Sequence, residues 1–189
     1  MFMKVERQLS SGQAQQQRVV LGIDPGYGML GYAVVSACGH EVMSLHACAA
    51  ISTPGTMPLA NRLLHIYQQL TDVVRVYQPC EAAIEKLFFG RNTTTAIAVA
   101  QARGIALLVL VQHGLSISEY TPNEVKLAVT GYGAAKKGQV GQMVRLLLHL
   151  DAVPQPDDAA DAAAIAICHV HTVHIVREAC PSYSLERSF

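Results

Sequence analysis

Four acidic residues lie where apolar segments end or a helix begins, and together they could bind metal ions. Asp24 follows an apolar run and precedes a glycine-containing turn, and Glu85 ends a second apolar run. Asp158 and Asp161 open an alanine-rich segment at a spacing of three, which puts both on one helix face. Carboxylates brought together repel one another unless a cation lies between them. An oxygen-only ligand set of this kind suits Mg²⁺ or Mn²⁺ better than zinc.

The chemistry typical of such a cluster is phosphodiester hydrolysis. Two divalent ions roughly 3.5–4 Å apart can activate a water molecule and stabilise the departing oxygen, and the glycines after Asp24 would let a phosphate approach the backbone. Taken singly, each acid also has a structural explanation: Asp24 as a turn residue, Asp158 as a helix cap. Asp157 is as well placed as Asp158 on geometry alone. Only the joint arrangement favours a metal site.

The elements that must position these acids follow from hydrophobic patterning. We expect strands at 18–24, 30–37, 41–51, 81–85 and 115–120, and helices at 57–77, 93–112, from Pro122, at 137–150 and from 157 to about 176. Thr121-Pro-Asn-Glu124 has the residues of a helix capping box. Short connections between the first three strands predict an antiparallel meander. The order predicts an α/β fold with a mixed five-stranded sheet and helices on both faces.

The chain should form one domain over residues 18–177, with a disordered N-terminal extension at 1–17 and a flexible tail at 178–189. No segment is predicted to span a membrane or to act as a signal peptide, so we expect a cytoplasmic protein. Five cysteines without a C-x-x-C pair argue against a disulfide framework or a zinc knuckle. The formal net charge is zero, but residues 86–151 hold seven Lys or Arg against three Asp or Glu. A basic DNA-binding face is therefore compatible with the composition.

Several short blocks, in order along residues 18–171, resemble the RuvC family of junction-cutting nucleases. The blocks are Leu21-Gly-Ile-Asp-Pro-Gly with Gly31-Tyr, Ala83-Ile-Glu-Lys-Leu-Phe-Phe with Asn92 and Gln101-Ala-Arg-Gly, Glu119-Tyr through Gln139-Val, and Asp158-Ala-Ala-Asp-Ala. The resemblance implies a ribonuclease H-like fold. The chain departs from a typical member in its N-terminal extension, in its zero net charge and in a histidine-dense stretch, His169, His171 and His174. Helix spacing does not place these three histidines on one face, so we expect them to be structural rather than metal ligands.

The resemblance also implies an activity and a set of site residues. The protein would be a crossover junction endodeoxyribonuclease that resolves Holliday junctions during recombination and repair by paired symmetric nicks, leaving 5′-phosphate ends. Asp24, Glu85, Asp158 and Asp161 would be catalytic and would hold two Mg²⁺ ions, replaceable by Mn²⁺, with Asp158 preferred over Asp157. Lys137 would be a further catalytic residue. The implied partners are four-way junction DNA and the RuvA and RuvB branch-migration proteins.

The resemblance further implies that Phe88, Lys126 and Lys137 contact DNA, and Arg91, Arg103 and Lys136 are additional candidates for phosphate contacts. Phe88 could stack on a junction base, although from the sequence alone core packing beside Phe89 is favoured. Lys137 could equally be a solvated surface lysine.

A junction with two-fold symmetry requires two matched active sites, so we expect a homodimer. The long apolar helix at 93–112 is the proposed interface.

Three alternatives stay open. The turn after Asp24 also resembles the phosphate loop of actin-like nucleotide-binding ATPases, which need two lobes. A non-catalytic junction-binding protein could share the fold, and so could a nuclease for RNA or plain duplexes.

Overall fold

The computed structural model describes residues 17–39, 41–87 and 93–179. Five strands form one mixed sheet in the order β3-β2-β1-β4-β5. The strands are β1 (Arg18–Asp24), β2 (Met29–Cys38), β3 (Glu41–Ser52), β4 (Glu81–Glu85) and β5 (Ser116–Tyr120). β1 pairs antiparallel with β2 and β2 with β3, whereas β1, β4 and β5 run parallel. The predicted meander and mixed sheet are confirmed.

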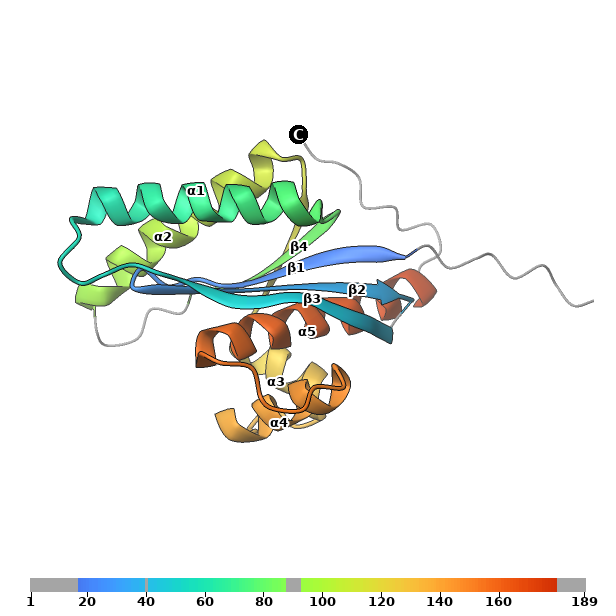
Figure 1. Cartoon of the computed structure of the whole chain (residues 1–189). Helices are drawn as coiled ribbons and strands as arrows, with labels where there is room; N and C mark the ends of the chain where they lie inside the picture. Colours follow the sequence, from blue (N-terminus) through green and yellow to red (C-terminus); the bar gives the residue numbers. More distant parts are fainter. Residues whose placement is uncertain (1–16, 40, 88–92, 180–189) are drawn as a thin grey trace, which may run out of the picture.

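Helices cover both faces of this sheet, as predicted (Figure 1). α1 (Leu59–Tyr77) and α2 (Thr93–Gln112) lie on one face. α5 (Asp157–Ala179) crosses the other face, with α3 (Pro122–Thr130) and α4 (Lys137–Leu147) packed outside it. The described residues thus form one sheet between two helical layers, without the second lobe that an actin-like ATPase needs. None of the described helices is long and apolar enough to cross a membrane.

The central strand owes its position to side chains that are buried on both faces. In β1, Val20 packs toward α5, whereas Leu21 and Ile23 pack toward α1 and α2, and all three are fully buried. This is the burial that a continuous apolar run predicts.

Helix ends follow local signals, with two corrections. The predicted capping box forms, because the Thr121 N–H donates to Glu124 Oε2 at 2.7 Å and the Glu124 N–H donates to Thr121 Oγ1 at 3.2 Å. The helix predicted from residue 57 begins at Leu59, because Pro58 is its N-cap in an extended conformation. The helix predicted to reach residue 150 ends at Leu147, since His149 adopts a left-handed φ of 53° that a continuing helix cannot accommodate.

Candidate active site

Asp24 and Glu85 lie side by side at the same end of two neighbouring parallel strands. The parallel register between β1 and β4 pairs Ile23 with Ile84, and each acid is the next residue on its strand. Side chains alternate between the two faces of a strand. Because Ile23 and Ile84 both point toward α1 and α2, the two acids point to the opposite face, under α5.

Two glycines let the start of α5 approach this end of the sheet. A Cβ on Gly22 would collide with the Ala162 carbonyl oxygen, and a Cβ on Gly31 would collide with the Asp158 carbonyl oxygen. Gly31 is also the partner of Asp24 in the β1–β2 register. The backbone of α5 therefore lies directly on the sheet beside Asp24, which brings Asp158 and Asp161 over the strand ends.

Electrostatic perturbation shows that the four acids lie within reach of one another. The pKa of Asp24 is raised from 3.8 to about 7, mainly by burial and then by Glu85, Asp161 and Asp158, while Lys137 lowers it. Burial also raises the pKa of Glu85, with Asp161 adding to the effect and Lys126 opposing it. Carboxylates whose pKa is raised by burial and by neighbouring acids are typical of a functional cluster. The structure thus brings together the four acids that the sequence singled out.

Lys137 and Lys126 approach this cluster from α4 and α3. Lys137 Nζ lies 2.8 Å from Asp161 Oδ2 and 3.4 Å from Asp157 Oδ2. Its hydrogen bond to Asp161 is the largest cause of its raised pKa. Asp157 is exposed, and it is not among the groups that perturb Asp24, whereas Asp158 is.

The other predicted DNA contacts have different surroundings. Phe88 and Arg91 lie outside the described residues. Lys136 is exposed, and its backbone N–H donates to Gln139 Oε1 at 2.8 Å. Arg103 is only slightly exposed: it pairs with Glu119 at 2.6 Å and donates from Nε to the Glu85 carbonyl at 3.1 Å. Its evident role is to hold the end of β4, and its contact with DNA stays a prediction.

The turn after Asp24 is fixed by residues that the sequence did not single out. Thr53 Oγ1 donates to the Tyr27 carbonyl at 2.5 Å, and the Thr53 N–H donates to the Gly28 carbonyl at 2.9 Å. The Arg62 guanidinium lies 5.4 Å from the centre of the Tyr27 ring. These contacts join the loop before α1 to the turn that follows Asp24, and no local sequence pattern predicts them.

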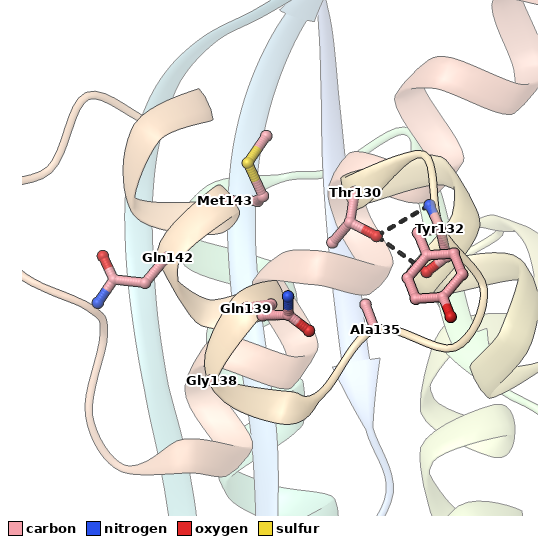
Figure 2. A pocket seen from close by; sticks show the side chains of 7 residues that line it. All are labelled: Thr130, Tyr132, Ala135, Gly138, Gln139, Gln142 and Met143. Atoms are coloured by element: carbon pink, nitrogen blue, oxygen red, sulfur yellow. Dashed lines mark hydrogen bonds between the residues drawn. The ribbon is translucent and has the colours of Figure 1, made fainter.

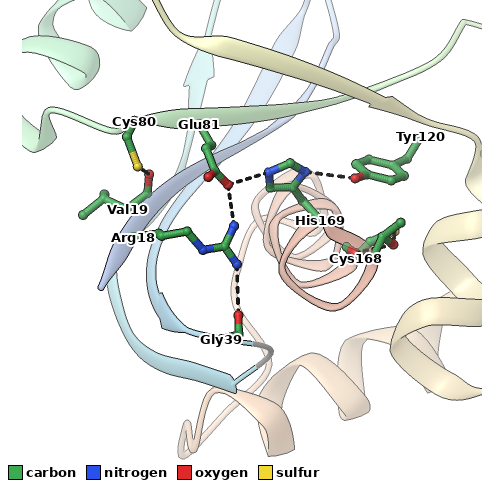
Figure 3. A network of polar contacts seen from close by, with 9 residues as sticks. Arg18, Val19, Gly39, Cys80, Glu81, Tyr120, Cys168 and His169 are labelled. Atoms are coloured by element: carbon green, nitrogen blue, oxygen red, sulfur yellow. Dashed lines mark hydrogen bonds and ion pairs between the residues drawn. The ribbon is translucent and has the colours of Figure 1, made fainter. Parts of the chain in front are cut away.

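Two histidines of the histidine-dense stretch, His169 and His171, make structural contacts. His169 is buried, with Nδ1 2.9 Å from the Tyr120 hydroxyl and Nε2 2.9 Å from Glu81 Oε2 (Figure 3). The Arg18 guanidinium completes the network with a 2.6 Å ion pair to Glu81. His171 bonds through Nδ1 to the Ala128 carbonyl at 3.1 Å, and the side chain of His174 lies outside the described part. The structural interpretation of His169 and His171 is therefore supported by their contacts.

A shallow pocket of about 380 Å³ lies between α3 and α4 (Figure 2). It is lined by Thr130, Tyr132, Ala135, Gly138, Gln139, Gln142 and Met143. None of the four acids lines it, so it is distinct from the carboxylate cluster.

The donor set fits hard divalent cations. All four groups are carboxylates, and the raised pKa of Asp24 shows that a counter-charge is needed when they ionise together. Among the side chains that the structure describes, no three His, Cys, Asp or Glu groups are already grouped around one ion position. The Lys137–Asp161 ion pair instead supplies part of the positive charge.

Comparison of the sequence with known proteins identifies one family. The sequence profile of the family described as crossover junction endodeoxyribonuclease RuvC matches residues 20–169. A RuvC of Desulfitobacterium hafniense is 49% identical over 159 residues, covering 84% of this chain and 95% of that protein. A RuvC of Chloroflexus aggregans is 53% identical over 152 residues, covering 80% and 92%.

Solved structures agree with these relatives. T. thermophilus RuvC in complex with a Holliday junction substrate superposes with a TM-score of 0.79 at 33% identity, covering 84% of this chain and 96% of that chain. The yeast mitochondrial Holliday junction resolvase Ydc2 superposes with a TM-score of 0.60 at 15% identity, covering 92% and 89%, a likeness of fold. With its ribonuclease H-like sheet and its four converging acids, this chain belongs to the RuvC family of crossover junction endodeoxyribonucleases.

Proposed function

We propose that this protein cuts four-way DNA junctions by metal-dependent hydrolysis of phosphodiester bonds. The observation that carries the proposal is the convergence of Asp24, Glu85, Asp158 and Asp161 at one end of the sheet, where burial first and the other three carboxylates second raise the pKa of Asp24 to about 7. A fold stores such repulsion at a cost to its stability, and a bound cation removes that cost. The T. thermophilus relative was solved with a junction, which supports the same substrate here.

Membership of the RuvC family implies dependence on a divalent metal. We infer that the ion is Mg²⁺, that two ions bind, and that all four acids hold them. Bound there, the ions would activate water and stabilise the charge on the departing oxygen. Lys137, at 2.8 Å from Asp161, supplies a mobile positive charge at the edge of the cluster. Lys126, whose charge lowers the pKa of Glu85, supplies another positive charge near the cluster.

A nicking assay tests this proposal. The wild type should cut a synthetic four-way junction in Mg²⁺, should cut linear duplex much less, and should cut neither in EDTA. Asp24→Asn, Glu85→Gln, Asp158→Asn and Asp161→Asn should abolish cutting while sparing junction binding. Asp157→Asn is the matched control, because Asp157 opens the same helix but does not perturb Asp24. Binding without cutting by the wild type would support the non-catalytic alternative, and full activity of Asp24→Asn would refute the site.

The exposed face of α2 supports a symmetric dimer. Ile97, Leu108 and Val111 are 64%, 47% and 65% exposed, which is unusual for large apolar side chains on a helix whose other side packs in the core. With Gln101 and Gly104 they form a stripe at alternating spacings of four and three, the pattern of a helix–helix seam. Open space above Gly104 would let a second helix approach closely. We infer that two copies pair through α2 about a two-fold axis, giving one active site for each of the two nicks.

Sedimentation of charge variants tests the dimer. Leu108→Glu should yield a monomer, because a carboxylate would be buried at the seam. Leu64→Glu is the control: Leu64 is 54% exposed on α1, on the same side of the sheet but outside the stripe. An unchanged dimer with Leu108→Glu would rule out this face. From the family likeness alone, we infer that the protein acts together with the RuvA and RuvB branch-migration proteins.

A further inference from the structure

The loop between α3 and α4 carries an exposed aromatic ring. Tyr132 is 62% exposed, and it is the second residue after α3 ends at Thr130. Tyrosine has a large apolar ring, which proteins usually bury at least in part or use to bind a partner. Core packing does not account for Tyr132, so its exposure points to a binding role.

Contacts within α3 and the loop fix the backbone that carries this ring. Thr130 Oγ1 donates to the Lys126 carbonyl at 2.8 Å and accepts from the Tyr132 N–H at 3.1 Å. A Cβ on Gly133 would lie 2.5 Å from Asn123 Oδ1, so the loop packs closely against the start of α3. The ring is therefore held in place before any ligand arrives, which lowers the entropic cost of binding.

The ring forms one side of the pocket between α3 and α4. Ala135 and Met143 add apolar surface, whereas Gln139 and Gln142 add two side-chain amides. In Figure 2 Ala135 lies between the Tyr132 ring and the Gln139 amide. The volume of about 380 Å³ is within the range of ligand sites, roughly 300–1,000 Å³. An apolar lining with a few polar groups suits a flat ring with polar edges, such as a nucleobase.

Both amides have the oxygen engaged and the nitrogen available. Gln139 Oε1 accepts from the Lys136 N–H at 2.8 Å, and Gln142 Oε1 accepts from Arg145 Nε at 3.1 Å. Because a backbone N–H and a guanidinium can only donate, the bonded atom of each amide must be its oxygen. Neither Nε2 group has an acceptor in the part of the chain that the structure describes. Nucleobases present acceptor atoms at their edges, which an apolar protein side chain does not, so the free donors favour a base.

Positive charge and the active site adjoin the pocket. Residues 121–147, which form α3, the loop and α4, hold four Lys or Arg against one Asp or Glu. This excess suits the phosphates of a nucleic acid. Gly138 lines the pocket and directly follows Lys137, whose Nζ lies 2.8 Å from Asp161 Oδ2. A DNA strand at the carboxylates therefore lies within a few residues' reach of the pocket.

We propose that Tyr132 stacks on an unpaired base of the DNA junction, which enters the pocket between α3 and α4. The proposal rests on the proposed function, because it takes the junction as the ligand. An aromatic face stacks on any base, so the contact needs no particular sequence. A base must leave its stack to reach the ring, which costs less at a branch point, where stacking is interrupted, than inside a duplex. Tyr132 is then a positioning residue, which holds a nucleotide without touching the reacting atoms.

Junction binding by Tyr132 variants tests the proposal. In an Asp24→Asn background, in which the junction should be bound without being cut, Tyr132→Ala should weaken binding roughly tenfold, a usual value for one stacked base. Tyr132→Phe keeps the ring and should bind like the background protein. Leu146→Ala is the matched control, because Leu146 is 53% exposed at the far end of α4 and does not line the pocket. Unchanged binding by Tyr132→Ala, which a protein segment in the pocket would also give, would overturn the proposal.

Abasic junctions separate stacking from a structural effect of the same substitution. In a series of junctions that each lack one base near the crossover, one position should weaken binding by the Tyr132 protein roughly tenfold. The same junction should be bound by the Tyr132→Ala protein as tightly as the intact one, because the stacking partner is already gone. If Tyr132→Ala weakens binding by the same factor on every junction of the series, the ring acts through the fold of the loop and the proposal fails.

A second variant keeps the test decisive if Tyr132→Ala disturbs the loop. A Cβ on Gly138 meets nothing within 4 Å, so Gly138→Leu adds a side chain to the pocket without a clash. Replacing a helical glycine should raise the melting temperature, while the filled pocket should weaken junction binding roughly tenfold. Gly138→Ala is the control, because it has the same effect on the helix and leaves most of the pocket open. Equal binding by the two Gly138 variants would also overturn the proposal.

Failure of this site can be told apart from failure of the proposed function. If the Asp24→Asn protein does not prefer a junction to linear duplex, the substrate assignment fails and the base contact fails with it. If that preference is present and the Tyr132→Ala and Gly138→Leu proteins bind as tightly as their controls, only the pocket is refuted.

Discussion

Removal of the Asp24 charge should stabilise the protein when no divalent ion is present. Burial and three neighbouring carboxylates raise the pKa of Asp24 from 3.8 to about 7. At pH 8 the folded protein must therefore hold an ionised carboxylate in a place that disfavours it, whereas the unfolded chain does not. Asp24→Asn keeps the shape of the side chain and removes the charge.

The size and the pH range of this effect follow from the shift. A change of about three pKa units corresponds to about 4 kcal/mol at ~1.36 kcal/mol per unit. The amide keeps its own burial cost, so we expect a gain of about 2–4 kcal/mol in the free energy of unfolding. Because the folded-state pKa is raised, the folded state binds the proton more tightly. The penalty is thus absent below pH 3.8, grows as the pH rises toward 7, and is constant above 7.

Urea unfolding in EDTA at pH 8 and at pH 4.5, at one protein concentration, measures this difference. Asp24→Asn should exceed the wild type clearly at pH 8 and by much less at pH 4.5. Added Mg²⁺ should narrow the difference at pH 8 by up to about 2.7 kcal/mol at about 100 times its Kd, because the variant has lost a ligand. Asp157→Asn should show neither effect. An Asp24→Asn protein no more stable than the wild type at pH 8 in EDTA would refute the clustered, repelling carboxylates.

Three further outcomes are expected. Lys137→Gln should slow single-turnover cleavage about 100-fold, the usual cost of one electrostatic group, with junction affinity reduced far less; a rate within threefold of wild type would exclude a catalytic lysine. Gly31→Ala should push the start of α5 off the sheet because its Cβ meets the Asp158 carbonyl, so the Mg²⁺-induced rise in melting temperature should disappear. Glu81→Ala should lower the free energy of unfolding by about 3–5 kcal/mol, since it leaves the buried charge of Arg18 unpaired. Urea titration measures this loss of stability, and a loss below 1 kcal/mol would show that the network is not a structural ion pair.

The sheet and the location of the four acids could be predicted because they depend on local patterns. The run at 18–24 is apolar on both faces, which indicates a central strand, and β1 has those bounds. An acid that directly follows such a strand lies at a sheet end wherever the strand goes. The resemblance to a family supplied the choice of Asp158 over Asp157, and the perturbation of Asp24 by Asp158 agrees with it.

The remaining features depend on contacts between distant segments, which local patterns do not specify. Arg103 and Glu119 are 16 residues apart and meet only because α2 packs across β4 and β5. The same applies to Arg62, which lies over the ring of Tyr27 although β2 and β3 separate the two residues in the sequence. The sequence offered Arg103 as a candidate DNA contact without indicating its pairing with Glu119, and it did not single out Arg62.

The two glutamates of β4 show how the fold treats structural and functional charge differently. Glu81 and Glu85 are four residues apart on one strand, so both point toward α5. Around Glu81 the protein supplies its own positive charge, from Arg18 at 2.6 Å, and His169 Nε2 lies 2.9 Å from the same carboxylate oxygen. Around Glu85 burial and Asp161 raise the pKa instead, and the charge of Lys126 lowers it. Both glutamates lie on the same strand and face the same helix, so the architecture could have placed an arginine beside Glu85 as it does beside Glu81. A cation taken from solution is the simplest explanation for the different surroundings of Glu85.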